Sequence, residues 1–172
     1  MKKLFLYYLI VFFISMVPIV ELRGAIPYAV TLNETLKNTG DPEMNMIIVY
    51  IISIIGNMLP VPFIFFFARR ILEWGKDKRI IGNFCTWCLK KGEKGGQKLQ
   101  AKAGRGLYIA LLLFVGIPLP GTGAWTGTLA ASFLDMDFKK SIWAVIGGVL
   151  LAGIIMFVAS YGVVGGINLF KQ

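Results

Sequence analysis

Apolar residues gather in four long regions of the chain, and the interruptions within them predict its architecture. Two of the regions, residues 44–68 and 142–170, carry no charge over almost their whole length. The other two, residues 4–36 and 107–134, are interrupted by short stretches rich in glycine and proline. Because about 20 helical residues cross a hydrocarbon layer of about 30 Å, the first pair predicts complete transmembrane helices. The second pair predicts shorter helical arms.

The two interruptions fall at residues 18–27 and 116–123. Non-helical backbone at membrane depth is tolerated only where protein or a wet cavity satisfies its N–H and C=O groups. Two such interruptions therefore predict two re-entrant hairpins that share an interior site. The alternative is that each interrupted region is one kinked span or two short spans.

The two halves of the chain also resemble each other. Placing Pro27 on Pro118, a shift of 91 residues, brings Gly56 onto Gly147, and a charge-free region follows each break. One crossing in each half would reverse the second copy, as in the inverted repeats of secondary transporters. We therefore predict an all-α integral membrane protein, an inverted repeat of a re-entrant hairpin plus a transmembrane helix. Its single membrane domain, residues 1–172, would comprise a first repeat (1–72), a basic cytoplasmic loop with an amphipathic helix (73–106) and a second repeat (107–172).

Composition and charge support a membrane location. The 172 residues are 56% hydrophobic and 16% charged, which is unusual for a water-soluble globule. Lys and Arg outnumber Asp and Glu by 18 to 9, and residues 69–105 alone hold eleven basic and three acidic residues, a net charge of +8. The positive-inside rule predicts a multi-pass protein of the cell membrane with this loop in the cytoplasm. Its partners would be membrane lipids rather than nucleic acid.

Within the basic loop, apolar residues recur at helical spacing beside lysines and arginines. Ile80, Ile81, Phe84, Trp87 and Cys88 form this pattern. It predicts an amphipathic helix that lies on an anionic leaflet. A solvated basic linker with a few apolar anchors is the alternative.

Several classes of function find no support in the residues. The chain has no His, and Cys85 and Cys88 form one CxxC pair without the second pair that zinc would need. The glycine-rich stretch lacks the Lys of a nucleotide-binding P-loop. We therefore predict no metal, no cofactor and no enzymatic activity.

Glu21 and Arg23 are the only charged residues between Lys3 and Glu34, and they lie beside the first interruption. Charged groups at membrane depth usually face a cavity, pair with each other or mark a route for substrate or protons. We predict that Glu21 exchanges a proton and that Arg23 binds substrate. An interfacial pair at the level of the headgroups is the alternative.

The sequence GIPLPGTGAWTGTLAA, residues 116–131, is the most distinctive stretch. Its prolines stop one arm, its glycines allow a tight turn, and a helix can restart with its positive N-terminus at the break, where Thr122 can add a hydroxyl. The predicted substrate-binding residues are Arg23, Pro27, Asn57, Pro118, Pro120, Gly121, Thr122, Gly123 and Thr126. A role in packing alone is the alternative for this stretch, and a simple proline kink for the segment around Asn57.

Three motifs together suggest a family. VELRGAIP at 20–27, GNMLPVPFIF at 56–65 and IPLPGTGAWTGTLAA at 117–131 resemble the small multi-drug export proteins of bacteria and archaea, and the resemblance covers nearly the whole chain. That family is similar to the DedA and VTT superfamily. This similarity implies two re-entrant hairpins in inverted repeat and proton-linked transport or scrambling of lipids, including polyprenyl phosphates.

The resemblance also implies roles for individual residues. The acidic residue of the first DedA hairpin would fall at Glu21, and the proline turn of the second at Pro118 to Gly121. The chain lacks the arginines that DedA proteins carry around the second turn, and Arg23 is the only candidate substitute in a hairpin.

These observations predict a small membrane transporter that exchanges protons and moves an anionic or amphipathic substrate, such as a phosphate-headed lipid, through a midplane cavity. One alternative is export of amphipathic cations, and another is a membrane scaffold without transport activity. Because about 170 residues make a thin wall around a substrate, we also expect a homodimer, served by the glycine faces at Gly147, Gly153 and Gly162.

Overall fold

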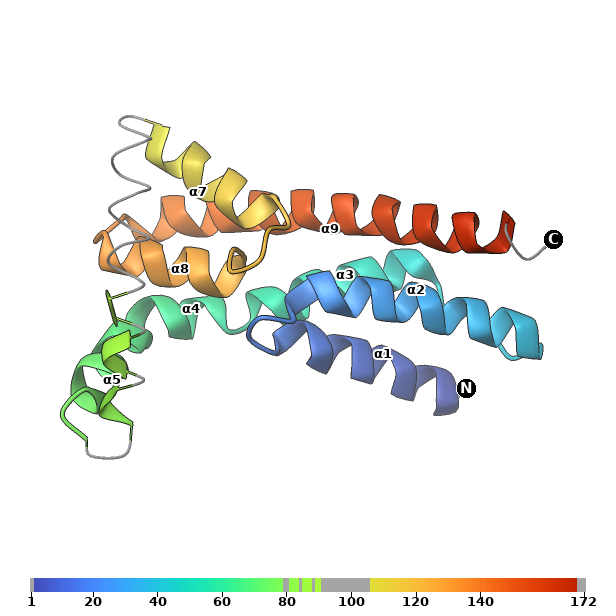
Figure 1. Ribbon diagram of the computed structural model, residues 1–172, viewed down its shortest axis with the longest axis horizontal. Helices are drawn as coiled ribbons and strands as arrows, with labels where there is room; N and C mark the ends of the chain where they lie inside the picture. Colours follow the sequence, from blue (N-terminus) through green and yellow to red (C-terminus); the bar gives the residue numbers. More distant parts are fainter. Residues whose placement is uncertain (1, 79–80, 84, 88, 91–105, 170–172) are drawn as a thin grey trace. The chain divides into compact units, whose positions relative to one another are not determined.

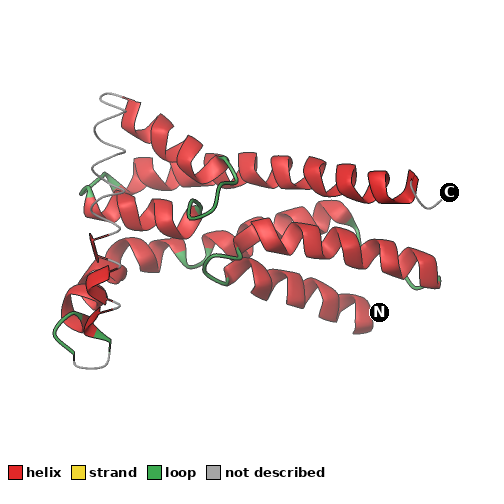
Figure 2. Cartoon of the chain, viewed as in Figure 1, coloured by secondary structure: helices red, strands yellow, loops and turns green. Residues whose placement is uncertain are grey.

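The structure is a computed structural model that describes residues 2–78, 81–83, 85–87, 89–90 and 106–169. All regular secondary structure in these residues is helical (Figure 2). The chain forms two compact units, and helix α9 (Phe138–Leu169) contributes to both. The first unit comprises Met1–Leu59 with Val149–Gln172, and the second comprises Pro60–Gly148.

The first unit contains three consecutive helices and the later part of α9 (Figure 1). The three are α1 (Lys2–Met16), α2 (Glu21–Thr39) and α3 (Met46–Met58). Helix α2 ends because Gly40 takes a left-handed conformation, with φ +73°, and donates its N–H to carbonyl groups of the last turn. Helix α3 begins at Asn45, whose side-chain oxygen accepts a hydrogen bond of 2.9 Å from the amide of Ile47.

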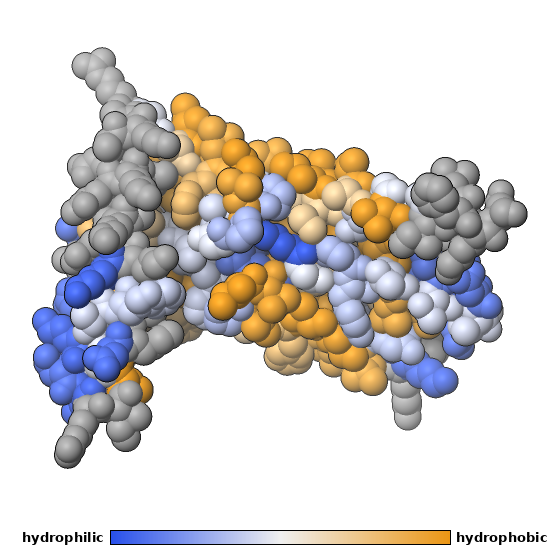
Figure 3. Space-filling model, in the orientation of Figure 1, coloured by the Kyte–Doolittle hydropathy of each residue, from blue (hydrophilic) through white to orange (hydrophobic). Residues whose placement is uncertain are grey.

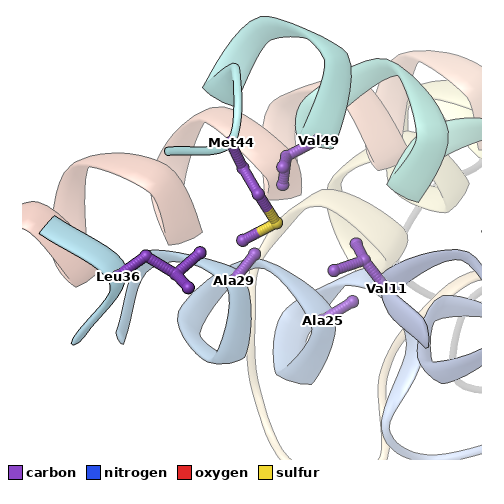
Figure 4. Close-up of a cluster of buried hydrophobic side chains, with 6 residues drawn as sticks. All are labelled: Val11, Ala25, Ala29, Leu36, Met44 and Val49. Atoms are coloured by element: carbon purple, nitrogen blue, oxygen red, sulfur yellow. The ribbon is translucent and has the colours of Figure 1, made fainter. Parts of the chain in front are cut away.

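A small apolar core joins these three helices. Residues from α1, α2, α3 and the loop before α3 meet in it, as Figure 4 shows: Val11, Ala25, Ala29, Leu36, Met44 and Val49. The buried positions of α2 recur every three to four residues, so one face of the helix packs inward. Helix α3 approaches α1 closely at Gly56, where an added Cβ would lie 2.7 Å from the carbonyl oxygen of Phe12.

Helix α9 is held to α3 by an aromatic side chain. The hydroxyl of Tyr50 donates a hydrogen bond of 2.9 Å to the carbonyl oxygen of Leu150. The Tyr50 ring packs edge to face on Phe157 and covers Gly153, where an added Cβ would lie 2.5 Å from it. The half-buried Tyr50 thus keeps its hydroxyl satisfied while its ring fills the space that Gly153 leaves.

The second unit contains the remaining helices and the first part of α9. In chain order these are α4 (Val61–Phe63), the π-helix η1 (Ile64–Ala68), α5 (Arg69–Gly75), α7 (Leu107–Gly116) and α8 (Ala124–Phe133). A π-helix shifts the backbone hydrogen-bond pattern by one residue. The hydroxyl of Ser132 in α8 donates a hydrogen bond of 2.7 Å to the carbonyl oxygen of Phe65 in η1. The irregular segment is thereby fixed to α8.

Helix α7 packs closely on α9 through two adjacent glycines. An added Cβ at Gly147 would lie 2.8 Å from the Leu112 side chain, and one at Gly148 would lie 2.7 Å from the Leu112 carbonyl oxygen. Of the three glycines expected to serve a homodimer, Gly147 and Gly153 therefore pack against side chains of their own chain. Only Gly162 has open space beside it, with nothing within 4 Å of an added Cβ.

The predicted long apolar helices are present. Met46–Phe67 and Phe138–Gly166 are long and apolar enough to cross a membrane. Large apolar side chains are also exposed on many helices, among them Phe5 on α1, Ile47 on α3 and Trp143 on α9. In Figure 3 the hydrophobic residues cover α1 and α7 on the face shown, while hydrophilic residues gather at α5. Such an extent of exposed apolar surface is suited to lipid.

Both predicted breaks are present, but the first is shorter than expected. It spans residues 17–20, and Glu21, Arg23 and Pro27 are already helical. The proline at the first break is therefore Pro18, so the alignment of Pro27 with Pro118 as two break residues was wrong. The second break spans residues 117–123, close to the predicted bounds.

The predicted amphipathic helix lies partly outside the described residues, which exclude Ile80, Phe84 and Cys88 as well as residues 91–105. Two of its apolar members, Ile81 and Trp87, are exposed. The orientation of the basic loop stays a prediction.

Candidate functional site

The first break carries left-handed backbone at two residues that are not glycine. Ile19 has φ +74° and Glu21 has φ +51°. A left-handed conformation costs roughly 1–2 kcal/mol for a residue with a side chain, and β-branched residues tolerate it least. The amide of Glu21 donates a hydrogen bond of 3.0 Å to the carbonyl oxygen of Val17, which closes the turn. Strain of this kind persists where the surrounding structure imposes it, often at functional sites.

Glu21 is buried although it begins a helix. Its residue is 3% exposed, whereas Ile19 in the turn before it is 94% exposed. The guanidinium group of Arg23, which is half-buried, interacts electrostatically with the Glu21 carboxylate. Two residues so close in a regular helix would point apart, and the left-handed backbone at Glu21 departs from that regularity. The structure thus brings together the two charged residues that the sequence singled out.

Helix α3 buries two polar side chains whose polar atoms make no hydrogen bond. Asn57 is 1% exposed and both atoms of its amide group lack a partner. Ser53, one turn earlier on the same face, is fully buried and its hydroxyl also lacks a partner. An unpartnered buried polar group costs about 1–3 kcal/mol, so two on one helical face need an explanation.

The buried polar side chains of α1, α2 and α3 lie at one end of these three helices. Ser15 and Glu21 flank the α1–α2 turn, and Ser53 and Asn57 belong to the last two turns of α3. The Ser15 hydroxyl donates a hydrogen bond of 2.7 Å to the carbonyl oxygen of Phe12. We call Ser15, Glu21, Ser53 and Asn57 the polar layer. Apolar packing gives way to this layer at the end of the unit that carries the first break.

The second break is built from glycines. Gly121 has φ +80° and Gly123 has φ +140°, values that side chains make costly. The hydroxyl of Thr122 donates to the carbonyl oxygens of Ile117 and Leu119, at 3.0 and 2.8 Å, and accepts from the Leu119 amide at 3.3 Å. Thr122 therefore holds the turn together, whereas the sequence suggested a ligand-binding hydroxyl.

The other predicted residues of the second break differ in exposure. Pro120, Gly121 and Thr126 are exposed, Pro118 is partly exposed, and Gly123 is buried. The hydroxyl of Thr126 lies 3.4 Å from the carbonyl oxygen of Gly123, to which it donates. The break thus exposes the apolar side chains of Ile117 and Leu119 together with Pro120 and Gly121.

Sequence reasoning missed Thr128, which is 1% exposed and whose hydroxyl has no hydrogen-bond partner. It also missed Ser53 and the similarly buried Ser141. One signal was available for Ser53, because it precedes Asn57 by four residues in an otherwise apolar stretch. No comparable spacing marks Thr128, which lies among small residues.

The basic segment places aromatic side chains beside lysines. The ammonium group of Lys78 lies 4.6 Å from the centre of the Trp74 ring, a cation–π distance. Trp74 is exposed, while Cys85 is buried against Gly75 and forms no disulfide. Cys88 lies outside the described residues. No group of three or more potential metal ligands of the His, Cys, Asp or Glu type occurs among the described residues.

The first unit therefore gathers several buried polar groups. It has a buried carboxyl group, a half-buried guanidinium group and unpartnered amide and hydroxyl groups. The predicted residues Glu21, Arg23, Pro27 and Asn57 belong to this unit, while those from Pro118 to Thr126 belong to the other.

A family model described as small multi-drug export protein matches residues 21–155. The matched range begins at Glu21 and includes both α3 and the second break. No protein of curated function and no solved structure matches the chain.

Proposed function

Since the chain belongs to the family of small multi-drug export proteins, we propose that it is a proton-coupled membrane transporter of anionic or amphipathic substrates. The observation that carries the proposal is the buried carboxyl group of Glu21, held on left-handed backbone beside Arg23. Acidic side chains are rare in the apolar interior of a membrane protein, and those that occur there usually have a functional role. The two long apolar helices, Met46–Phe67 and Phe138–Gly166, support a membrane location.

The proposed mechanism uses competition at Arg23. When Glu21 is ionised, its carboxylate pairs with the guanidinium group of Arg23. When Glu21 takes up a proton, the attraction weakens and Arg23 can bind an anionic group, such as a lipid phosphate. Release of the substrate restores the interaction and releases the proton. Substrate and proton would therefore move together.

The second hairpin carries the other interrupted segment. Its break exposes Pro120 and Gly121 with the backbone around them, and the midplane of such transporters is where interrupted segments bind substrates. Two re-entrant hairpins in inverted repeat, as in DedA proteins, remain part of this proposal.

A second candidate function is export of amphipathic cations. The family description favours it, because it names multi-drug export. In that mechanism Glu21 alternates between binding the cation and binding a proton. Arg23 would then oppose substrate binding instead of supporting it.

The test is flux into vesicles that contain the purified protein and carry an imposed pH gradient. The probes are a fluorescent phosphatidic acid for the anionic class and ethidium for the cationic class. We expect Arg23→Gln to abolish phosphatidic acid movement, and Glu21→Gln to uncouple either flux from the pH gradient. The controls are Lys37→Gln and Glu43→Gln, which remove exposed charges on α2 and in the loop after it.

Each outcome distinguishes one interpretation. Flux of ethidium that Arg23→Gln leaves intact or increases would support the exporter instead. Flux that persists in Glu21→Gln with its pH dependence unchanged would overturn the role of Glu21. The absence of flux for both probes would favour a membrane scaffold.

A further inference from the structure

We propose that Asn57 is the hydrogen-bond partner of Glu21 when Glu21 carries a proton. In this proposal the carboxyl group of Glu21 has two positions. Ionised, it interacts with Arg23 on its own helix; protonated, it pairs with the amide of Asn57 on α3. The inference rests on the proposed function, because it assigns the second position of the proton-carrying side chain.

The helical register places the two residues in one layer. Ala25 and Ala29 of α2 and Val49 of α3 belong to the apolar core, together with Val11 of α1 (Figure 4). Glu21 is buried at the start of α2, four residues before Ala25 and at the end of the helix nearest the break. Asn57 lies two turns from Val49 along the buried face of α3, in the same direction, because α2 and α3 run antiparallel.

A hydrogen bond at the edge of the core joins α2 to the loop before α3. The side-chain oxygen of Asn33 in α2 accepts a bond of 2.7 Å from the amide of Met44, just before α3. From this pair the two helices run antiparallel, so the first turn of α2, with Glu21, and the last turn of α3, with Asn57, lie toward the same end. Gly56 itself contacts Ser15, which places α1 at the same level.

The chemistry of the unpartnered amide matches a protonated carboxyl group. Asn57 offers an acceptor oxygen and a donor nitrogen side by side, and neither atom has a partner. A carboxylic acid offers one donor and one acceptor in the same arrangement, so the two groups can form a pair of parallel hydrogen bonds. A carboxylate has no proton to donate and can satisfy only the amide nitrogen. The amide edge therefore matches the protonated carboxyl group in both of its hydrogen bonds.

The energetics of burial support the same assignment. When Glu21 is ionised, the amide of Asn57 is left without partners, which is costly in a buried site. Protonation of Glu21 removes the charge that holds it to Arg23 and creates a donor that needs an acceptor away from water. Movement of the carboxyl group to Asn57 satisfies both groups and leaves Arg23 available to a substrate anion. Ser53, one turn further into the unit, extends the polar face without a charge.

The test is infrared difference spectroscopy of the full-length protein in lipid vesicles, between neutral and acidic pH. We expect wild-type protein to show the carbonyl band of a hydrogen-bonded carboxylic acid, and Glu21→Gln to lose it. Asn57→Leu, which has nearly the same shape without the amide, should keep the band but move it to higher wavenumber. Asn57→Gln should also shift the band, because its amide is displaced by one methylene group.

Thr128→Val is the matched control, since it removes a buried and unpartnered hydroxyl from the other unit. It should leave the band where it is in the wild type. A Glu21-dependent band that does not move in Asn57→Leu or in Asn57→Gln would overturn the inference and leave the proposed transport intact. If wild-type protein shows no Glu21-dependent band, Glu21 carries no proton, and its coupling role in the proposed function is overturned with the inference.

Discussion

The two helical hairpins of this protein reverse direction in different ways. The α1–α2 hairpin turns over residues 17–20 and places left-handed backbone at Ile19 and Glu21. The α7–α8 hairpin turns over residues 117–123 and places it at Gly121 and Gly123, where it costs little. The second turn is also braced by the Thr122 hydroxyl.

This difference separates a strained turn from a relaxed one. In the first hairpin the strain falls on Ile19, two residues before the buried carboxyl group, and on Glu21 itself. In the second, the positions that need unusual backbone are occupied by glycine, and the neighbouring polar side chain stabilises the loop. We infer that the first hairpin is arranged around the chemistry of Glu21 and that the second is arranged for a fixed shape.

The hairpins share one feature: the first helix of each closely approaches the helix that follows the hairpin. These pairs are α1 with α3 and α7 with α9. Gly56 packs on the Phe12 carbonyl and Gly148 on the Leu112 carbonyl, each at 2.7 Å from an added Cβ. We expect Gly56→Val and Gly148→Val each to lower the free energy of unfolding by about 3 kcal/mol, because backbone must move to admit the side chain. Thermal unfolding of the purified protein in detergent measures the effect.

Gly162→Val is the control for this pair, because an added Cβ there has open space. Its midpoint should stay close to that of the wild type. If Gly56→Val and Gly148→Val unfold at the same temperature as Gly162→Val, the close approaches are not part of the folded protein.

Gly123→Ala tests the relaxed turn directly. The φ of +140° at Gly123 is a conformation that essentially only glycine adopts, so the alanine should cost about 2 kcal/mol. Thermal unfolding provides the measurement again. Gly106→Ala serves as the control, because Gly106 has φ −89° and nothing within 4 Å of an added Cβ. If Gly123→Ala and Gly106→Ala unfold at the same temperature, the backbone at residue 123 does not require glycine.

Thr122→Val tests the brace in the same turn. The variant keeps the shape of the side chain but loses its hydrogen bonds to Ile117 and Leu119, which predicts a loss of about 1 kcal/mol. Thr126→Val should cost less, since the Thr126 hydroxyl is exposed and makes one long contact of 3.4 Å. We expect Thr122→Val to have the lower of the two unfolding midpoints. The reverse order would contradict our interpretation of Thr122.

Ile19→Gly should have a smaller effect of opposite sign. Glycine relieves the left-handed strain at an exposed position, and the gain exceeds the entropy that glycine adds to the unfolded chain by about 0.5 kcal/mol. Val17→Gly, in the same turn but without positive φ, should lower the midpoint. A loss of stability in Ile19→Gly would show that the first turn is not strained.

The sequence by itself determined the helical elements and their interruptions. Runs of apolar residues without charge can hide their backbone groups only as helices, and this fixed the two long spans. Proline and glycine located the second break to within a residue. Glu21, Arg23 and Asn57 could be selected because charges and amides are rare in such sequences.

Only the tertiary structure decided what those residues contact. Pro27 and Pro18 are equally plausible break residues in the sequence, but packing of α2 on α1 and α3 makes the helix continue through Pro27. Thr122 and Thr128 are both threonines in a glycine-rich stretch, yet one braces a turn and the other is buried without a partner. Helical spacing alone does not reveal which face meets another helix. The polar layer arises because the end of α1, the start of α2 and the end of α3 come together.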